Sequence, residues 1–143
     1  MAYNVHFEDV EVGYEIPPFE RKTDFMNWNR YAAVNDEFLY IHMDDEAGAA
    51  AGQGAAFGMG NLRWAYVLNG LRDWAGDEAE IRELSLQFRA INHKNDVLRV
   101  YGKVVEKKQE DGANLVVLEV NVLNQDDAKT APGRAVVALP SRG

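Results

Sequence analysis

The sequence contains no cysteine, which excludes disulfide bonds, thiolate zinc sites and cysteine nucleophiles. It also contains no apolar run that approaches the roughly 20 residues needed to span a bilayer. The segment Met1–Val12 has neither the basic region nor the apolar region of a secretory signal. We therefore expect a cytoplasmic protein that does not enter a membrane.

Basic residues are in the minority. The chain has 15 lysines and arginines against 23 acidic residues, which gives a formal net charge of -8 at pH 7. A general nucleic-acid binder needs a basic surface that attracts phosphates, so we expect no nucleic-acid partner. The charge balance still permits a small anionic ligand held by a few local cations, because net charge governs long-range steering rather than one pocket.

The length and the apolar content predict one globular domain over residues 1–143, since 47% of the 143 residues are hydrophobic. Two short helices are expected in the first half. Thr23 can cap one over residues 24–34, and Asp44 or Asp45 can cap another that ends at Ala51. Residues 57–74 then predict one long, central buried helix, because no proline interrupts their apolar positions at helical spacing, which are Trp64, Val67, Leu71 and Trp74.

The apolar period changes to two in the second half of the chain, which is typical of strands. Strands are expected near residues 84–88, 98–104, 115–123 and 135–139. Consecutive strands joined by short polar turns predict an antiparallel sheet, with the helices gathered in the first half. The predicted class is α+β, with one curved antiparallel sheet wrapped around one long helix.

One histidine lies in a dense group of polar residues. Asp36 and Glu37 precede His42 by six and five residues, in a loop between two predicted helices. A carboxylate and an imidazole that converge on one water can share proton transfer, because histidine titrates near neutrality. The spacing alone fits a loop of solvated helix caps as well, because the chain holds 23 acids.

Small residues over 52–60 lead into the predicted long helix. Free backbone N–H groups at a helix start can stabilise a developing oxyanion, although a closely packed helix start explains the composition equally well. The segment matches neither a dinucleotide fingerprint nor a phosphate loop, because position 63 is Arg and no Gly-Lys-Ser/Thr follows.

Metal binding is poorly supported by the sequence. Asp44, Asp45 and Glu46 are consecutive, so they cannot all face one ion from a helix, and no second histidine is near. We expect no metal and no cofactor. Four basic residues of the strand half are candidates for a phosphorylated ligand tail, although such residues are usually solvated: Arg89, Lys94, Arg99 and Arg134.

At these residues the sequence resembles the MaoC-like family of hot-dog-fold (R)-specific enoyl-CoA hydratases and 3-hydroxyacyl dehydratases. The resemblance covers nearly the whole chain, beginning with Phe7–Gly13 and Pro17–Pro18. The family's central pattern is Gly-Asp-x-Asn-Pro-aliphatic-His, followed shortly by an acid. Ile41 and His42 match this pattern, and Asp44 follows.

The chain departs from the pattern at three positions. Leu39 and Tyr40 stand where the family has Asn and Pro, and gapless alignment places the catalytic acid on Glu37. A one-residue insertion would restore Asp36 as the acid instead. We favour Glu37, because its extra methylene is absorbed more easily than a change of register, and Asp36 stays open.

The family's His-Gly-Met at the start of the central helix corresponds to Phe57–Met59. The histidine is lost and the glycine of the oxyanion hole, Gly58, is kept. The resemblance therefore implies that backbone N–H groups near Gly58, flanked by Phe57 and Met59, bind the thioester oxygen of the substrate.

The resemblance implies a hydro-lyase: syn addition of water to a trans-2-enoyl-CoA, or the reverse dehydration, in fatty acid or steroid metabolism. Hot-dog domains usually pair, so it also implies a homodimer or a heteromer with a related subunit. Residues 47–76 resemble the small subunits of actinobacterial steroid side-chain enoyl-CoA hydratases, which makes a bulky acyl group conceivable. Two alternatives stay open: a hot-dog thioesterase, and a non-catalytic partner subunit that binds acyl-CoA.

Overall fold

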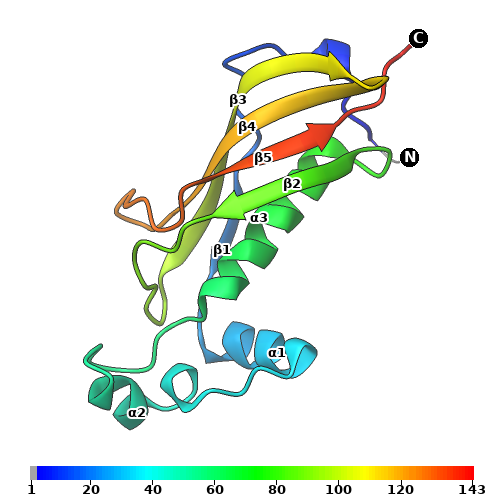
Figure 1. Ribbon diagram of the computed structural model, residues 1–143. Helices are drawn as coiled ribbons and strands as arrows, with labels where there is room; N and C mark the ends of the chain where they lie inside the picture. The colour runs from blue at the N-terminus through cyan, green and yellow to red at the C-terminus, as the bar shows by residue number, and fades with distance from the viewer. Residues whose placement is uncertain (1–2) are drawn as a thin grey trace.

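A computed structural model describes residues 3–143 (Figure 1). In the sequence, its three helices follow the first strand and precede the other four strands. Short 3-10 turns lie at Phe7–Asp9 and at Tyr40–His42. The helices are α1 (Phe25–Asn35), α2 (Asp45–Ala50) and α3 (Gly60–Ala75), and the strands are β1 (Phe19–Lys22), β2 (Glu80–Leu86), β3 (Val97–Glu110), β4 (Ala113–Leu123) and β5 (Gly133–Ala138).

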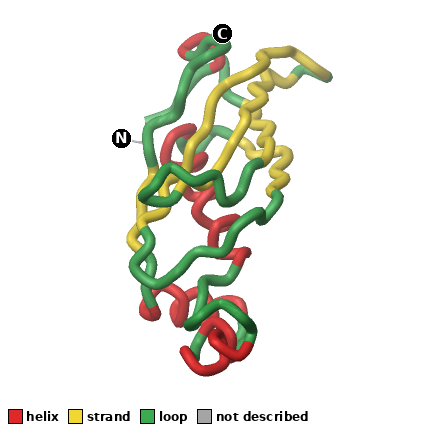
Figure 2. The backbone as a smooth tube through the Cα atoms, turned by 90° about the vertical axis from the view of Figure 1, so that its left-hand side faces the viewer, coloured by secondary structure: helices red, strands yellow, loops and turns green. Residues whose placement is uncertain are grey.

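All neighbouring strands are antiparallel, in the order β1-β3-β4-β5-β2. The sheet curls around α3, while α1 and α2 lie beyond the N-terminal end of that helix (Figures 1 and 2). Asp111 and Gly112 join β3 to β4, and both have positive φ, of 50° and 79°. This is the conformation of a type I′ turn, whose twist matches that of the hairpin. The predicted α+β class is confirmed.

The concave face of the sheet packs against the buried face of α3. Val67 and Leu71 of this helix are fully buried. On β3 the inward positions alternate as predicted, with Leu98, Val100 and Val104 in the core. The core therefore fixes the position of α3, whose N-terminal end faces the segment that carries His42. No helix within residues 3–143 has the length and apolar character that crossing a membrane requires.

Two predicted helix starts are wrong. The N-cap of α1 is Asp24, whose carboxylate accepts the Asn27 N–H at 3.1 Å. Thr23 is fully buried instead, and its hydroxyl donates to the Asp96 carbonyl at 3.0 Å. A buried hydroxyl needs a partner, and the connection before β3 supplies a carbonyl that no local pattern in the sequence reveals.

The long helix begins at Gly60 rather than at residue 57, because the preceding residues pair with other segments. Phe57 forms an isolated antiparallel bridge with His93, and its N–H donates to the Ile41 carbonyl at 3.2 Å. Asp44 caps α2 as predicted and accepts the Ala47 N–H at 2.8 Å. Phe57 is therefore a bridging residue between two loops and not a helical one.

Neighbouring valines on β3 test this packing. Val104 is 0% exposed, whereas Val105 is 45% exposed at a bulge opposite β4. Val104→Ala should lower the free energy of unfolding by about 2 kcal/mol, through lost burial and a residual cavity. Val105→Ala should change it by less than about 0.5 kcal/mol. Urea denaturation measures both, and equal effects would contradict the inward orientation of Val104.

Candidate active site

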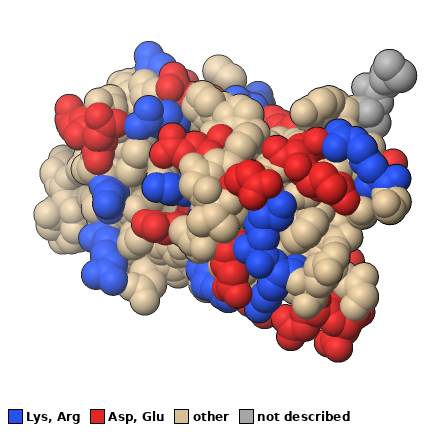
Figure 3. Space-filling view, turned by 90° about the horizontal axis from the view of Figure 1, so that it is seen from above, with Lys and Arg blue, Asp and Glu red and all other residues tan. Residues whose placement is uncertain are grey.

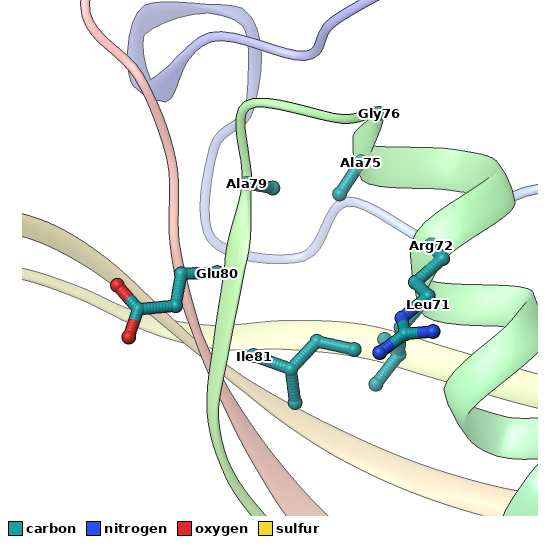
Figure 4. Close-up of a pocket in the computed structure, with 7 residues that line it drawn as sticks. All are labelled: Leu71, Arg72, Ala75, Gly76, Ala79, Glu80 and Ile81. Carbon is teal, nitrogen blue, oxygen red and sulfur yellow. The ribbon is translucent and has the colours of Figure 1, made fainter.

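The C-terminal end of α3 borders a cavity whose lining offers no pair of groups for proton transfer. A cavity of about 220 Å³ lies between the C-terminal end of α3 and the start of β2 (Figure 4). Its walls are largely aliphatic and include no histidine. In Figure 4 the Glu80 carboxylate points away from Arg72, and it pairs with Arg82 at 3.0 Å. The chemistry of the chain therefore has to be sought at the other end of the helix.

His42 lies at that other end, in the 3-10 turn between α1 and α2. Its side chain is buried, with 7% of the residue exposed. The Nδ1 atom is 2.7 Å from the Phe57 carbonyl oxygen, and the two rings pack edge to face with centroids 5.0 Å apart. Phe57 thus positions the imidazole by a hydrogen bond and by ring packing.

This contact determines the tautomer of His42. A carbonyl oxygen only accepts hydrogen bonds, so Nδ1 must carry the proton. In the neutral ring Nε2 then has a free lone pair. Among residues 3–143 no side chain or backbone group bonds to Nε2, and that atom is not enclosed without solvent contact. His42 can therefore accept a proton through Nε2 from a small molecule beside it.

The two candidate acids occupy different environments at the end of α1. Asp36 is exposed and ends the helix in the left-handed conformation, with φ of 52°. Glu37 is half-buried, and its N–H donates to the Ala32 carbonyl at 3.0 Å. Burial raises the pKa of the Tyr31 phenol, and the charge of the Glu37 carboxylate raises it further.

No ion pair joins His42 to an acid within the described residues, so neither candidate is within 4.0 Å of the imidazole nitrogens. The structure brings Glu37 and His42 into one loop without direct contact. A water can bridge polar groups separated by more than about 3.5 Å.

Gly58 packs against a buried asparagine. Its N–H donates to the Asn92 carbonyl at 2.8 Å, and a Cβ at this position would meet Asn92 Nδ2 at 2.1 Å. The free donors lie just beyond it: among residues 3–143 no acceptor takes the N–H groups of Met59, Gly60 or Asn61. These three groups start α3 and carry its positive dipole end.

The aspartates near His42 hold the loop together. Asp44 caps α2, and Asp45 accepts the Ala56 N–H at 3.1 Å and binds the Lys94 ammonium at 2.8 Å. The hydrogen bond from Lys94 lowers the pKa of the Asp45 carboxyl. Within residues 3–143 no three acidic or histidine side chains gather as a metal site would require.

The basic residues proposed for a ligand tail are divided among separate places. Arg89 and Arg134 line one cavity of about 300 Å³ beside β2. Arg99 pairs with Asp127 at 2.8 Å, and Lys94 is held by Asp45. The face seen in Figure 3 mixes acidic and basic side chains without a continuous basic area. Of the four, only Arg89 and Arg134 share a cavity that a phosphorylated tail can enter.

No sequence pattern singled out Arg63, a buried cation in the first turn of α3. It is 2% exposed, its Nη1 donates to the carbonyls of Ala90 and Thr130, and its guanidinium lies 4.8 Å from the Phe88 ring centre. Burial lowers its pKa to about 10. The helical period could have found it, because position 63 shares a face with Val67.

Comparison with known proteins gives structural similarity alone. No family model matches the sequence, and no curated protein does. Among solved structures, the unliganded (R)-hydratase of Pseudomonas aeruginosa has a TM-score of 0.88 at 21% identity, covering 97% of this chain and 88% of that one. A MaoC-like dehydratase from Rhodospirillum rubrum has a TM-score of 0.83 at 19% identity, covering 98% and 99%.

A chain of the ChsH1–ChsH2 complex from Mycobacterium tuberculosis is also similar, with a TM-score of 0.79 at 21% identity over 90% of this chain and 98% of that one. These similarities confirm the predicted hot-dog fold. Several of the matching structures are named as (R)-hydratases or MaoC-like dehydratases, the family that the sequence resemblance indicated.

The tautomer of His42 is directly testable. In long-range ¹H–¹⁵N NMR spectra recorded at about pH 8, where histidine is neutral, Nδ1 should show the shift of a protonated nitrogen and Nε2 that of an acceptor. The reason is the carbonyl of Phe57, which can only accept. A proton found on Nε2 would contradict the contact between Nδ1 and Phe57.

Proposed function

We propose that this chain catalyses the (R)-specific hydration of a trans-2-enoyl thioester to the 3-hydroxyacyl thioester, or the reverse dehydration. The observation that carries the proposal is the bond from His42 Nδ1 to the Phe57 carbonyl. It leaves Nε2 as a proton acceptor beside the loop of Glu37 and the N-terminus of α3. The fold that the chain shares with (R)-hydratases supports the same reaction.

The reaction needs a base, an acid and a site for negative charge. In the proposal, Glu37 and His42 hold one water, and His42 Nε2 takes a proton from it as the water oxygen bonds to the β-carbon of the enoyl group. The electron pair of the double bond moves toward the thioester carbonyl and gives an enolate. The proton that the imidazolium now holds is delivered to the α-carbon, directly or by relay through the Glu37 carboxylate, which restores the neutral His42 and completes the addition.

The enolate oxygen is assigned to the start of α3. The N–H of Gly58 already donates to Asn92, so in the proposal the donors are the neighbouring N–H groups of Met59 and Gly60, which have no acceptor within residues 3–143. Donors aimed at a developing charge are among the strongest contributions to catalysis. Gly58 and Phe57 then position the segment rather than bind the oxyanion.

Glu37 is the better acid of the two candidates. It is half-buried, and its charge raises the pKa of the Tyr31 phenol, whereas Asp36 is exposed and serves as the helix end. A partly desolvated carboxylate interacts more strongly with a nearby water and imidazole than an exposed one. We therefore assign the acid to Glu37 and a conformational role to Asp36.

The dyad is tested by turnover of crotonyl-CoA and of longer or branched 2-enoyl-CoA substrates, followed by loss of the enoyl absorbance. His42→Ala and Glu37→Gln should each lower kcat by about 10²–10⁴, the usual contribution of a proton-transferring group. Asp36→Asn is the matched control for Glu37→Gln and should stay within about threefold.

Two outcomes contradict the proposal. Turnover that survives His42→Ala would exclude the dyad mechanism, and free thiol released without hydration would identify a thioesterase. If Asp36→Asn alone abolished turnover, the assignment of the acid would be wrong while the reaction class stood.

A second hot-dog subunit is proposed at β2. This strand lies at the edge of the sheet and pairs only with β5 among the described strands, so its outer backbone groups are unpaired. A seven-residue open edge readily adds another strand. Exposed apolar side chains also flank His42 and would be covered by substrate or partner: Phe38, Leu39, Tyr40 and Met43.

Light scattering on the purified chain should therefore give twice the mass of one copy, or the single-copy mass together with inactivity if the required partner is a different subunit. An active monomer would contradict the partner proposal. The non-catalytic alternative has its own support, because Leu39 and Tyr40 replace the Asn-Pro pair. It predicts that the chain binds enoyl-CoA without turning it over.

A further inference from the structure

A third cavity lies between α1 and α3. Its volume is about 290 Å³, close to the lower end of the roughly 300–1,000 Å³ typical of ligand pockets. It is formed by the end of β1, one side of α1 and the N-terminal half of α3, and its lining includes two arginines, two tyrosines and two asparagines but no acidic residue.

The two arginines are not neutralised by acids. No carboxylate within residues 3–143 lies within 4.0 Å of the guanidinium of Arg21 or of Arg30. Arg21 is nevertheless held in place, because its guanidinium lies 4.0 Å from the Phe19 ring centre and donates to the Glu20 carbonyl at 2.8 Å. Both arginines are exposed to solvent and share one cavity that no acidic residue lines, so this cavity offers two cations to an anionic group.

The other polar groups of the cavity are hydrogen-bond donors. Burial raises the pKa of the Tyr31 and Tyr66 phenols, so both keep their protons at neutral pH and can donate. Asn27 uses its side-chain oxygen to accept the Asp24 N–H at 3.2 Å, which leaves its amide N–H₂ free. Asp24 lies near Tyr66, but its carboxylate accepts the Asn27 N–H as the α1 cap.

The cavity and the proposed active site both use the N-terminal half of α3. Tyr31 lines the cavity and also lies close enough to Glu37 to be influenced by its charge. Leu62 and Tyr66, two turns or less beyond the free N–H groups of α3, form the opposite wall. A substrate bound at the start of α3 can therefore reach the cavity with a short extension.

We propose that the cavity is a subsite for an anionic group of the substrate, a carboxylate at the far end of the acyl chain, held by Arg21 and Arg30. The inference rests on the proposed function, because it extends the thioester substrate into this space. The substrate class is then the 2-enoyl thioester of a dicarboxylic acid. A phosphate of the thiol carrier offers the same chemistry, and the experiment separates the two sources.

Binding is measured first, because it needs no turnover. Adipate and inorganic phosphate are titrated into ¹⁵N-labelled protein, and adipate should shift the amide signals of α1 and α3 around the cavity. The double variant Arg21→Gln/Arg30→Gln should weaken binding by about tenfold or more, since charge-assisted hydrogen bonds are lost. Lys22→Gln is the matched control, because Lys22 neighbours Arg21 on β1 and does not line the cavity.

Turnover then distinguishes the sources. An enoyl-CoA with a terminal carboxylate is compared with one of equal length that ends in methyl. A ratio of kcat/KM that favours the carboxylate, and that falls about tenfold in the double variant but not in Lys22→Gln, supports the proposal. Equal losses on both substrates would assign the cavity to the carrier phosphate and overturn the acyl assignment.

Failure of the subsite and failure of the reaction remain separable. If adipate shifts no cavity signal and the double variant changes neither binding nor the kcat/KM ratio, the anion subsite is refuted, whether or not the chain hydrates enoyl-CoA. If adipate binds at the cavity and no enoyl-CoA is turned over, the subsite stands and the proposed reaction fails.

Discussion

The arrangement of the candidate site depends on the two-residue extended segment Phe57–Gly58. The Phe57 carbonyl accepts His42 Nδ1–H, its N–H donates to Ile41, and the Gly58 N–H donates to Asn92. Three segments far apart in the sequence are thereby joined at the start of α3. Without these bonds neither the imidazole nor the first N–H groups of the helix would have a fixed orientation.

The packing of α3 against the sheet and the hydrogen bonds of Arg63 hold this segment in place. The curled sheet buries one face of α3, which fixes where that helix begins, and Arg63 connects its first turn to the carbonyls of Ala90 and Thr130. A buried guanidinium is costly unless it is hydrogen-bonded, so these carbonyls and the Phe88 ring are part of its stabilisation. The same turn therefore combines free N–H donors with a nearby positive charge, which favours an anionic reaction intermediate.

The proposed reaction and the anion subsite place different demands on the same end of the molecule. In the proposed reaction, the imidazole and the carboxylate come from the loop around His42, and the backbone donors come from the start of α3. The subsite needs cations, and these come from β1 and α1, outside that loop. In these two proposals, the loop and the start of α3 set the reaction type, and β1 and α1 set the substrate class.

Periodicity predicted much of the molecule. Apolar residues recur with a period of two in β3 and β4 and at helical spacing in α1 and α3. This spacing predicted the α+β class and the curved sheet. It also predicted the inward positions, which are Val67, Leu71, Val100 and Val104. The family resemblance at His42 pointed to the loop between α1 and α2 as the candidate site. The side chain of Asp44 predicted the N-cap of α2. Each of these depends on neighbours within a few residues.

Other features depended on contacts between distant segments. The helix α3 begins at Gly60 and not at residue 57, because Phe57 and Gly58 form hydrogen bonds with Ile41 and Asn92. Thr23 does not cap α1, because its hydroxyl donates to the Asp96 carbonyl. Contacts between distant segments also decide the tautomer of His42, the burial of Arg63 and the position of Arg21 and Arg30 at the cavity between α1 and α3. The sequence by itself determined the elements and the residue types of the site. Only the tertiary structure decided which hydrogen bonds are occupied, because a backbone group's partner is set by whichever segment packs beside it.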